Sequence, residues 1–79
     1  MKRRGYATAY EQLATLLRAE RLRAGLTQAQ LATKLDRPQS FIAKLESGER
    51  QLDVIEFLLV MRAIGSKTGV LLRRLEQAL

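Results

Sequence analysis

Three polar side chains that can bond to base edges lie close together between residues 38 and 46. At about 100° per residue, a helix over this range places Gln39, Ser40 and Lys44 on one side and the apolar Ile42 on the other. Glutamine can bond bidentately to adenine, lysine can donate to the acceptor edge of guanine, and serine bonds with little selectivity. The spacing therefore indicates a polar helix face that can touch a partner, and for an arbitrary helix ordinary solvation of that face is the favoured interpretation.

Phe41 belongs to the same candidate set, although its position on the helix is ambiguous. The helical spacing places it at the edge of the apolar side. Its ring can press on a thymine methyl group, or it can pack inside with one edge exposed. We count it among the candidate base-contacting residues and favour the packed arrangement.

The composition disfavours other kinds of chemistry. The chain has no cysteine and no histidine, which removes disulfides and the usual zinc-ligand sets. A catalytic nucleophile would have to be a serine or threonine beside a lysine or carboxylate, and no strand-turn-helix frame for such a pair is visible. We therefore expect no enzyme activity, no metal and no cofactor.

Two short helices joined by a tight turn must position the candidate face. Thr27 and Gln30 have the spacing of a capping box, which marks the start of a helix over residues 28–35. Pro38 suits the first position of a second helix, over residues 38–46, and it disfavours helical geometry in the residue before it. The pattern predicts a supporting helix, a turn and a second helix of barely two turns.

This pattern resembles the helix-turn-helix of the phage repressor and Cro-like (XRE-type) DNA-binding family. The resemblance is carried by Gln28, Ala32, Ile42, Leu45 and the continuation Glu46-Ser47-Gly48. One position departs from the family pattern, because Asp36 stands in the turn where glycine is usual. Aspartate tolerates left-handed geometry less well than glycine but better than most residues, so we expect the turn to form with slight strain.

The resemblance implies an all-α, compact five-helix domain of the lambda-repressor type. It also implies a sequence-specific regulator of transcription that binds double-stranded DNA, acting as a homodimeric repressor on a palindromic operator. Activation through contact with RNA polymerase uses the same fold. The alternative within this resemblance is an antitoxin or adaptor whose main role is to bind a protein partner such as a toxin.

The resemblance assigns roles to further residues. Gln28 is similar to a family glutamine that grips a phosphate and braces the second helix of the motif. Arg21 and Glu46 occupy positions where an ion pair ties the first helix to that second helix, and two independent surface charges are the alternative. The candidate phosphate-binding residues are Gln28, Lys34, Arg37 and Arg50, with simple solvation as the alternative for Arg50.

The ends of the first helix follow from local signals. Residues 1–7 are basic and poor in apolar side chains, so we predict a flexible arm followed by a domain over residues 8–79. Thr8 and Glu11 have capping-box spacing, which predicts a helix from residue 8 to about residue 24.

Two more helices complete the domain. Asp53 can cap a helix over residues 54–64, and Ser66 can cap a last helix over residues 67–78. We attribute the apolar stripe of the first of these to packing; its members are Val54, Phe57, Leu58, Met61 and Ile64. The last helix carries more leucine than a small core needs. The resemblance implies that part of this face joins two subunits or binds a partner, and packing on the first and fourth helices is the alternative; the candidate residues are Leu71, Leu72, Leu75 and Leu79.

Length and charge are consistent with this assignment. A chain of 79 residues makes one domain, and 14 Lys plus Arg against 8 Asp plus Glu gives a net charge of +6. A basic surplus suits a polyanion such as DNA, although solubility alone can also explain it. No apolar run is long enough to cross a bilayer and no signal-peptide core follows the first residues, so we expect a cytoplasmic protein with no membrane partner.

Overall fold

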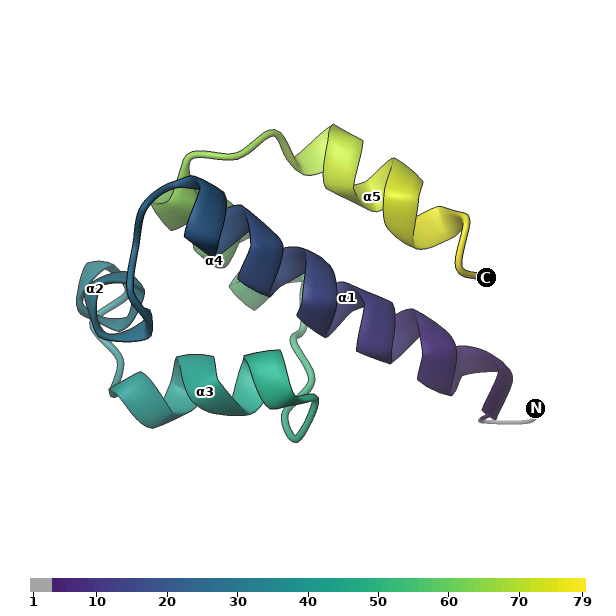
Figure 1. Ribbon diagram of the computed structural model, residues 1–79, viewed down its shortest axis with the longest axis horizontal. Helices are drawn as coiled ribbons and strands as arrows, with labels where there is room; N and C mark the ends of the chain where they lie inside the picture. Colours follow the sequence, from purple (N-terminus) through teal and green to yellow (C-terminus); the bar gives the residue numbers. More distant parts are fainter. Residues whose placement is uncertain (1–3) are drawn as a thin grey trace.

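Five α-helices make up the part of the chain that the computed structural model describes, residues 4–79, and no strand occurs there (Figure 1). The predicted all-α, five-helix class is confirmed. The second, third and fourth helices agree with their predicted ranges to within one residue, whereas the first and last differ. The helices are α1 (Arg4–Arg23), α2 (Gln28–Lys34), α3 (Gln39–Ser47), α4 (Val54–Ile64) and α5 (Thr68–Glu76).

The first helix starts earlier than the sequence predicts. α1 begins at Arg4, so Thr8 lies one turn inside it and does not mark its start. No proline precedes Thr8 and Ala7 favours helix, so the chain can extend the helix backwards past the capping-box pattern. Residues 4–7, which we assigned to a flexible arm, are therefore helical. Residues 1–3 of that predicted arm lie outside the described residues.

All five helices contribute to one apolar core. The least exposed large side chains are Leu31, Ile42 and Met61, each below 2 % exposed. Because burial of aliphatic side chains drives folding without fixing direction, this cluster holds the helices together but does not by itself set their angles. The core residues are Leu16, Leu17, Leu31, Ala32, Phe41, Ile42, Leu45, Phe57, Val60, Met61, Ile64 and Leu71.

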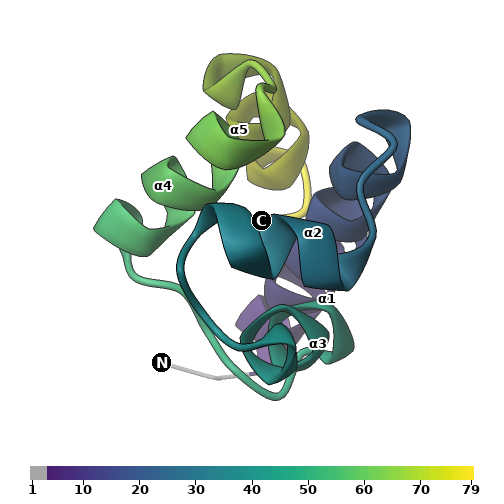
Figure 2. The same ribbon diagram turned by 90° about the vertical axis from the view of Figure 1, so that its left-hand side faces the viewer.

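The helices surround this core on different sides. Figure 2 shows α3 at the bottom, α5 at the top, α4 on the left and α1 on the right, with α2 in front. The side of α3 that faces away from the core therefore lies across the molecule from α5. Within residues 4–79, no helix combines the length and the apolar character needed to cross a membrane.

The last helix corrects part of the predicted dimer face. Lys67 precedes α5 without a side-chain capping bond, so the expected cap at Ser66 is not formed and the helix starts at Thr68. Leu71 is 3 % exposed and Leu75 packs against the core, whereas Leu72 and Leu79 are exposed. Leu71 cannot belong to an open face, because its side chain is used in packing against the other helices.

Substitution of the two neighbouring leucines should separate these roles. Leu71→Ala should lower the free energy of unfolding by about 2 to 5 kcal/mol, because it leaves a cavity in the core. Leu72→Ala should change it by less than about 0.5 kcal/mol. Urea unfolding followed by circular dichroism, at one protein concentration, measures both. Equal losses for the two variants would contradict the assignment of Leu71 to the core.

Candidate nucleic-acid interface

The turn between α2 and α3 is a Schellman motif with aspartate at its left-handed position. The N–H of Asp36 donates to the Thr33 carbonyl at 3.1 Å, and the N–H of Arg37 donates to the Ala32 carbonyl at 2.9 Å. These are the two bonds that define the motif. Asp36 has φ of 56°, while Gly65, at the corresponding position after α4, has φ of 83°. The predicted turn is present, and aspartate adopts in it a conformation that favours glycine.

The outer side of α3 carries the three polar residues that the spacing placed there. Gln39, Ser40 and Lys44 are exposed, whereas Ile42 and Leu45 are 1 % and 4 % exposed. The helix therefore presents one polar surface and buries the other side against the core. Contact of these three side chains with DNA bases remains a prediction.

Phe41 does not belong to this outer surface. Its residue exposure is only 9 %, and the guanidinium groups of Arg37 and Arg50 lie over its ring, 5.0 and 4.6 Å from the centroid. Cations at this distance are attracted to the negative face of an aromatic ring. The ring of Phe41 therefore packs in the core beneath two arginines, which is the arrangement that we favoured, and little of it is left for contact with a base.

A buried ion pair fixes α3 against α1. Arg21 Nε donates to one oxygen of Glu46 at 2.6 Å and Arg21 Nη2 donates to the other at 2.9 Å, and both side chains are 6 % exposed. The remaining nitrogen, Nη1, donates to the Leu26 carbonyl at 2.8 Å. The hydrogen bond to Glu46 raises the pKa of Arg21 against the opposing effect of burial. This pair joins α1 to α3, as the family resemblance implied.

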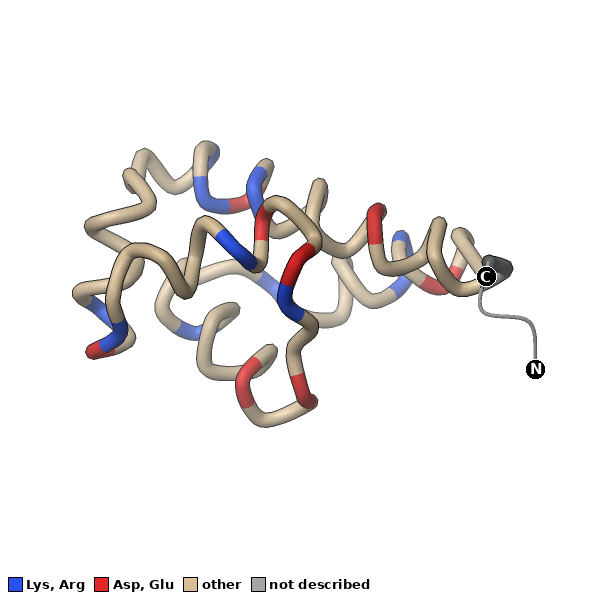
Figure 3. The backbone as a smooth tube through the Cα atoms, turned by 90° about the horizontal axis from the view of Figure 1, so that it is seen from below, with Lys and Arg blue, Asp and Glu red and all other residues tan. Residues whose placement is uncertain are grey.

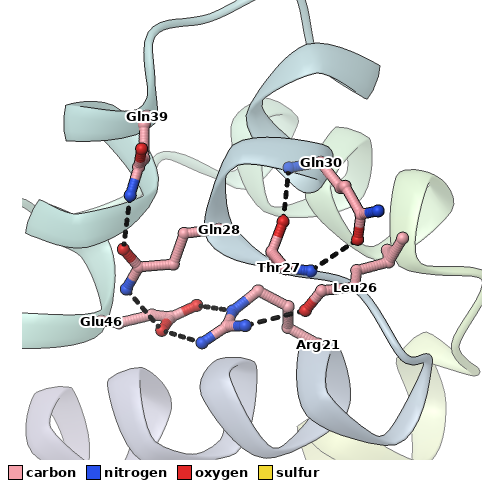
Figure 4. Close-up of polar contacts among 7 residues, drawn as sticks. All are labelled: Arg21, Leu26, Thr27, Gln28, Gln30, Gln39 and Glu46. Carbon is pink, nitrogen blue, oxygen red and sulfur yellow. Dashed lines mark hydrogen bonds and ion pairs between the residues drawn. The ribbon is translucent and has the colours of Figure 1, made fainter.

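Gln28 extends the ion pair to the start of α3 (Figure 4). Its Nε2 donates to Glu46 at 3.1 Å, and its Oε1 accepts a longer bond from Gln39 Nε2 at 3.4 Å. Each amide nitrogen carries two hydrogens, so both glutamines keep a donor for another partner. The bracing of α3 by Gln28 is thus present, and its contact with a phosphate remains a prediction.

Capping boxes close the starts of α2 and α4. Thr27 Oγ1 accepts from the N–H of Gln30 at 3.0 Å, and the Gln30 side chain accepts from the N–H of Thr27 at 2.9 Å. Asp53 and Glu56 form the same reciprocal pair at the start of α4. Both boxes satisfy backbone donors that have no partner inside the helix.

Sequence reasoning missed an ion pair between Arg50 and Glu56. Arg50 Nη1 and Nη2 donate to the two oxygens of Glu56 at 3.1 and 2.8 Å. These bonds, with that from the backbone N–H of Asp53, lower the pKa of Glu56. The link therefore stabilises the fold above the ordinary pKa of glutamate and weakens as the pH falls through the lowered value. The two residues are six apart across a loop, where no periodic pattern reveals them.

The proposed phosphate-binding residues differ in how free their charges are. Lys34 and Arg37 are exposed, whereas Arg50 is partly covered and bonded to a carboxylate. Figure 3, seen from the α3 side, shows basic and acidic positions interspersed. Over the described residues, no group of three or more acidic side chains gathers into a possible metal site.

Comparisons with known proteins support this architecture. The family model for the helix-turn-helix domain matches residues 12–75. An XRE-family like protein from Pseudomonas syringae pv. tomato str. DC3000 is 49% identical, with a TM-score of 0.81, and the match covers 87% of this chain and 84% of that one. The comparison with curated proteins gives no match.

A more distant solved structure shares the fold. The restriction-modification controller protein C.Esp1396I, a tetramer in complex with its natural 35 base-pair operator, is 23% identical with a TM-score of 0.78. The match covers 89% of this chain and 92% of that one. At this identity the match is evidence for the arrangement of the helices.

Glycine at the turn should stabilise the domain. Asp36→Gly should raise the free energy of unfolding by about 0.5 to 1 kcal/mol, because it relieves the left-handed conformation and removes a negative charge at the end of α2. Asp36→Asn is the matched control, since it removes the charge and keeps the side-chain size. Urea unfolding of the wild type and the two variants separates the contribution of the backbone conformation from that of the charge. A less stable glycine variant would show that the aspartate side chain makes a favourable contact.

The ion pair can be tested by a double-mutant cycle. Arg21→Ala and Glu46→Ala should each lower the free energy of unfolding by about 3 to 5 kcal/mol, because each leaves a charge buried without its partner. The double variant should lose less than the sum of the two losses. Unfolding in urea, followed by circular dichroism, gives the coupling energy. Additive losses would show that the two side chains act independently.

Proposed function

The chain belongs to the XRE-type helix-turn-helix family, and we propose that it is a transcriptional regulator that binds specific sequences of double-stranded DNA. The observation that carries this proposal is the outer side of α3, where Gln39, Ser40 and Lys44 are exposed on a helix held by a buried ion pair. Hydrogen bonds to bases need donors and acceptors in fixed positions, and a braced helix supplies them.

Base contact would involve three side chains with different tasks. Gln39 would bond bidentately to adenine, since its bond to Gln28 uses only one amide hydrogen. Lys44 would donate to the acceptor edge of guanine, and Ser40 would bond with little selectivity. Each good bidentate pair discriminates against the wrong base by about 1 to 3 kcal/mol.

Phosphate contacts would set the register of α3 on the duplex. The exposed Lys34 and Arg37 would take this role, and the second amide hydrogen of Gln28 is available to a phosphate. Arg50 would contribute less than the sequence suggested, because Glu56 already neutralises its charge. Its main task is then to hold Phe41 and the loop after α3.

The small size of the contact surface supports a homodimer, which we propose acts as a repressor. α3 has nine residues and reaches too few bases to select one genomic site. A two-fold dimer on a palindromic operator, with half-sites about 34 to 36 Å apart, supplies the missing specificity. Such a dimer bound over a promoter excludes RNA polymerase without any chemical step. A solved structure of a related fold, C.Esp1396I, is itself an operator complex.

A protein-binding adaptor, such as an antitoxin, is the second candidate function. The observation in its favour is the number of large apolar side chains exposed on α4 and α5, among them Ile55 and Leu72. Apolar surface of this kind marks protein contacts. Binding of random duplex at low salt separates the candidates, because an adaptor that ignores DNA would give no gel shift.

Selection of bound DNA sequences by the pure protein tests the main proposal. We expect a palindromic sequence to be enriched, and Lys44→Ala to change the preferred base at one position of each half-site. Lys34→Ala should instead weaken binding to all sequences alike and reduce the slope of log affinity against log salt by about 0.9.

The control is a lysine-to-alanine substitution far from α3. Lys67→Ala removes one positive charge at the start of α5, across the molecule from α3, and should leave the selected sequence unchanged. No shift of any duplex at low salt would overturn the proposal of a DNA-binding regulator. A change of base preference in the Lys34 variant, with none in the Lys44 variant, would reverse the two assignments.

A further inference from the structure

A surface cavity lies between α1 and α5. α5 runs alongside α1 (Figure 1), and the loop between α4 and α5 also lines the space between them. The cavity has a volume of about 370 Å³, and its apolar walls come from Leu16, Val70 and Leu71. Small-molecule sites have volumes of about 300 to 1,000 Å³, apolar walls and a few polar groups that orient the ligand. This space, which we call the α1–α5 cavity, has the dimensions of such a site.

Three basic side chains and one acidic side chain line the α1–α5 cavity. The basic ones are the exposed Arg23, Lys67 and Arg74, and the acidic one is Glu20. The carboxylate of Glu20 is already paired, since it lies 3.4 Å from Arg23 Nη1. Within residues 4–79, Lys67 and Arg74 form no ion pair. The cavity therefore has a surplus of positive charge, and two of its cations have no carboxylate partner.

Helical spacing explains why apolar and charged side chains meet in this cavity. Each helix contributes a set of residues spaced three and four apart, which places the members of a set on one side of the helix. The set on α1 is Leu16, Glu20 and Arg23, and the set at the start of α5 and within it is Lys67, Val70 and Arg74. In the second set an apolar residue that is 48 % exposed stands between two cations.

We propose that the α1–α5 cavity binds a small organic anion, a carboxylate or a phosphate that carries an apolar group. The apolar group lies against Leu16 and Leu71, and the negative charge is held by Lys67 and Arg74. Charge-assisted hydrogen bonds from such cations are stronger than bonds between neutral groups. Because a water molecule occupies about 30 Å³ in the liquid, the cavity holds a ligand of roughly ten non-hydrogen atoms.

The proposed ligand site is separate from the proposed DNA-contacting face. Figure 2 places α5 at the top of the molecule and α3 at the bottom. A molecule in the α1–α5 cavity therefore leaves the outer side of α3 open, and the cations that hold it differ from the phosphate-binding candidates Lys34 and Arg37. The inference thus goes beyond the proposed function and does not depend on it.

Titration of the full chain, labelled with ¹⁵N and followed by NMR, tests the inference. Phenyl phosphate is the probe, because it joins an apolar ring to a phosphate. Inorganic phosphate carries the charge alone, and benzyl alcohol carries a ring without charge. Phenyl phosphate should shift the amide signals of residues 65–71 and of the end of α1 near Arg23. It should bind at least about tenfold more tightly than either control compound, because it alone uses both the walls and the cations.

Two neighbouring arginines of α5 supply matched variants. Arg73 and Arg74 are both exposed, and only Arg74 lines the α1–α5 cavity. Arg74→Glu should raise the dissociation constant of phenyl phosphate by about tenfold, because it replaces an attractive charge with a repulsive one. Arg73→Glu makes the same change of charge and should raise that constant less than about twofold, since salt screens a charge that does not contact the ligand.

The outcomes separate a specific site from general attraction to a basic protein. Circular dichroism checks that both variants are folded. Equal affinity for phenyl phosphate and inorganic phosphate, or equal losses in the two arginine variants, overturns the inference because either result needs only net charge. Signals that shift only around α2 and α3, or no shift at about 10 mM phenyl phosphate, also overturn it. Localised shifts together with a loss confined to the Arg74 variant support it.

Discussion

The arrangement of the helix-turn-helix depends on the buried pair of Arg21 and Glu46. A guanidinium and a carboxylate that are both 6 % exposed must satisfy each other in a narrow geometry, since any other arrangement leaves a charge without water or partner. Apolar packing gives the domain its cohesion and favours certain angles between the helices. The pair adds a directional contact that accepts only one orientation of α3 relative to α1. Gln28 bonds to both Glu46 and Gln39, so it links the ion pair to the first turn of α3, where the proposed DNA-contacting face begins.

A second polar link controls the other flank of α3. Phe41 packs in the core, and the guanidinium groups of Arg37 and Arg50 lie over its ring. Arg50 also forms an ion pair with Glu56 of α4. Glu56 also closes the capping box at the start of α4, so one carboxylate organises both the loop after α3 and the next helix. This use of Arg50 lowers its value as a free cation. Positive charge near α3 thus serves two purposes, and only part of the net charge of +6 is available to a polyanion.

The sequence correctly predicted features whose residues lie a few positions apart, such as helix caps and the polar and apolar sides of one helix. The capping boxes at Thr27 and Asp53 formed because their partners are three residues away, and the spacing of α3 sorted its polar and apolar sides. The pattern at Thr8 misled because a capping box marks a start only where the preceding chain cannot be helical. The resemblance to a family supplied the pairing of Arg21 with Glu46, which are 25 residues apart. No such guide existed for Arg50 and Glu56.

The leucines of α5 and the outer side of α4 show a second limit of sequence reasoning. Helical spacing groups residues into faces, but it does not say which face meets the rest of the chain. Leu71 and Leu72 are neighbours with the same chemistry, and only the packing of α5 on the core buries one and leaves the other in water. In α4, spacing attributed Val54 and Leu58 to the core, although both are exposed. α4 also holds Glu56, which is bonded to Arg50 in the loop after α3, so the position of α4 in the fold bears on the flank of α3 as well.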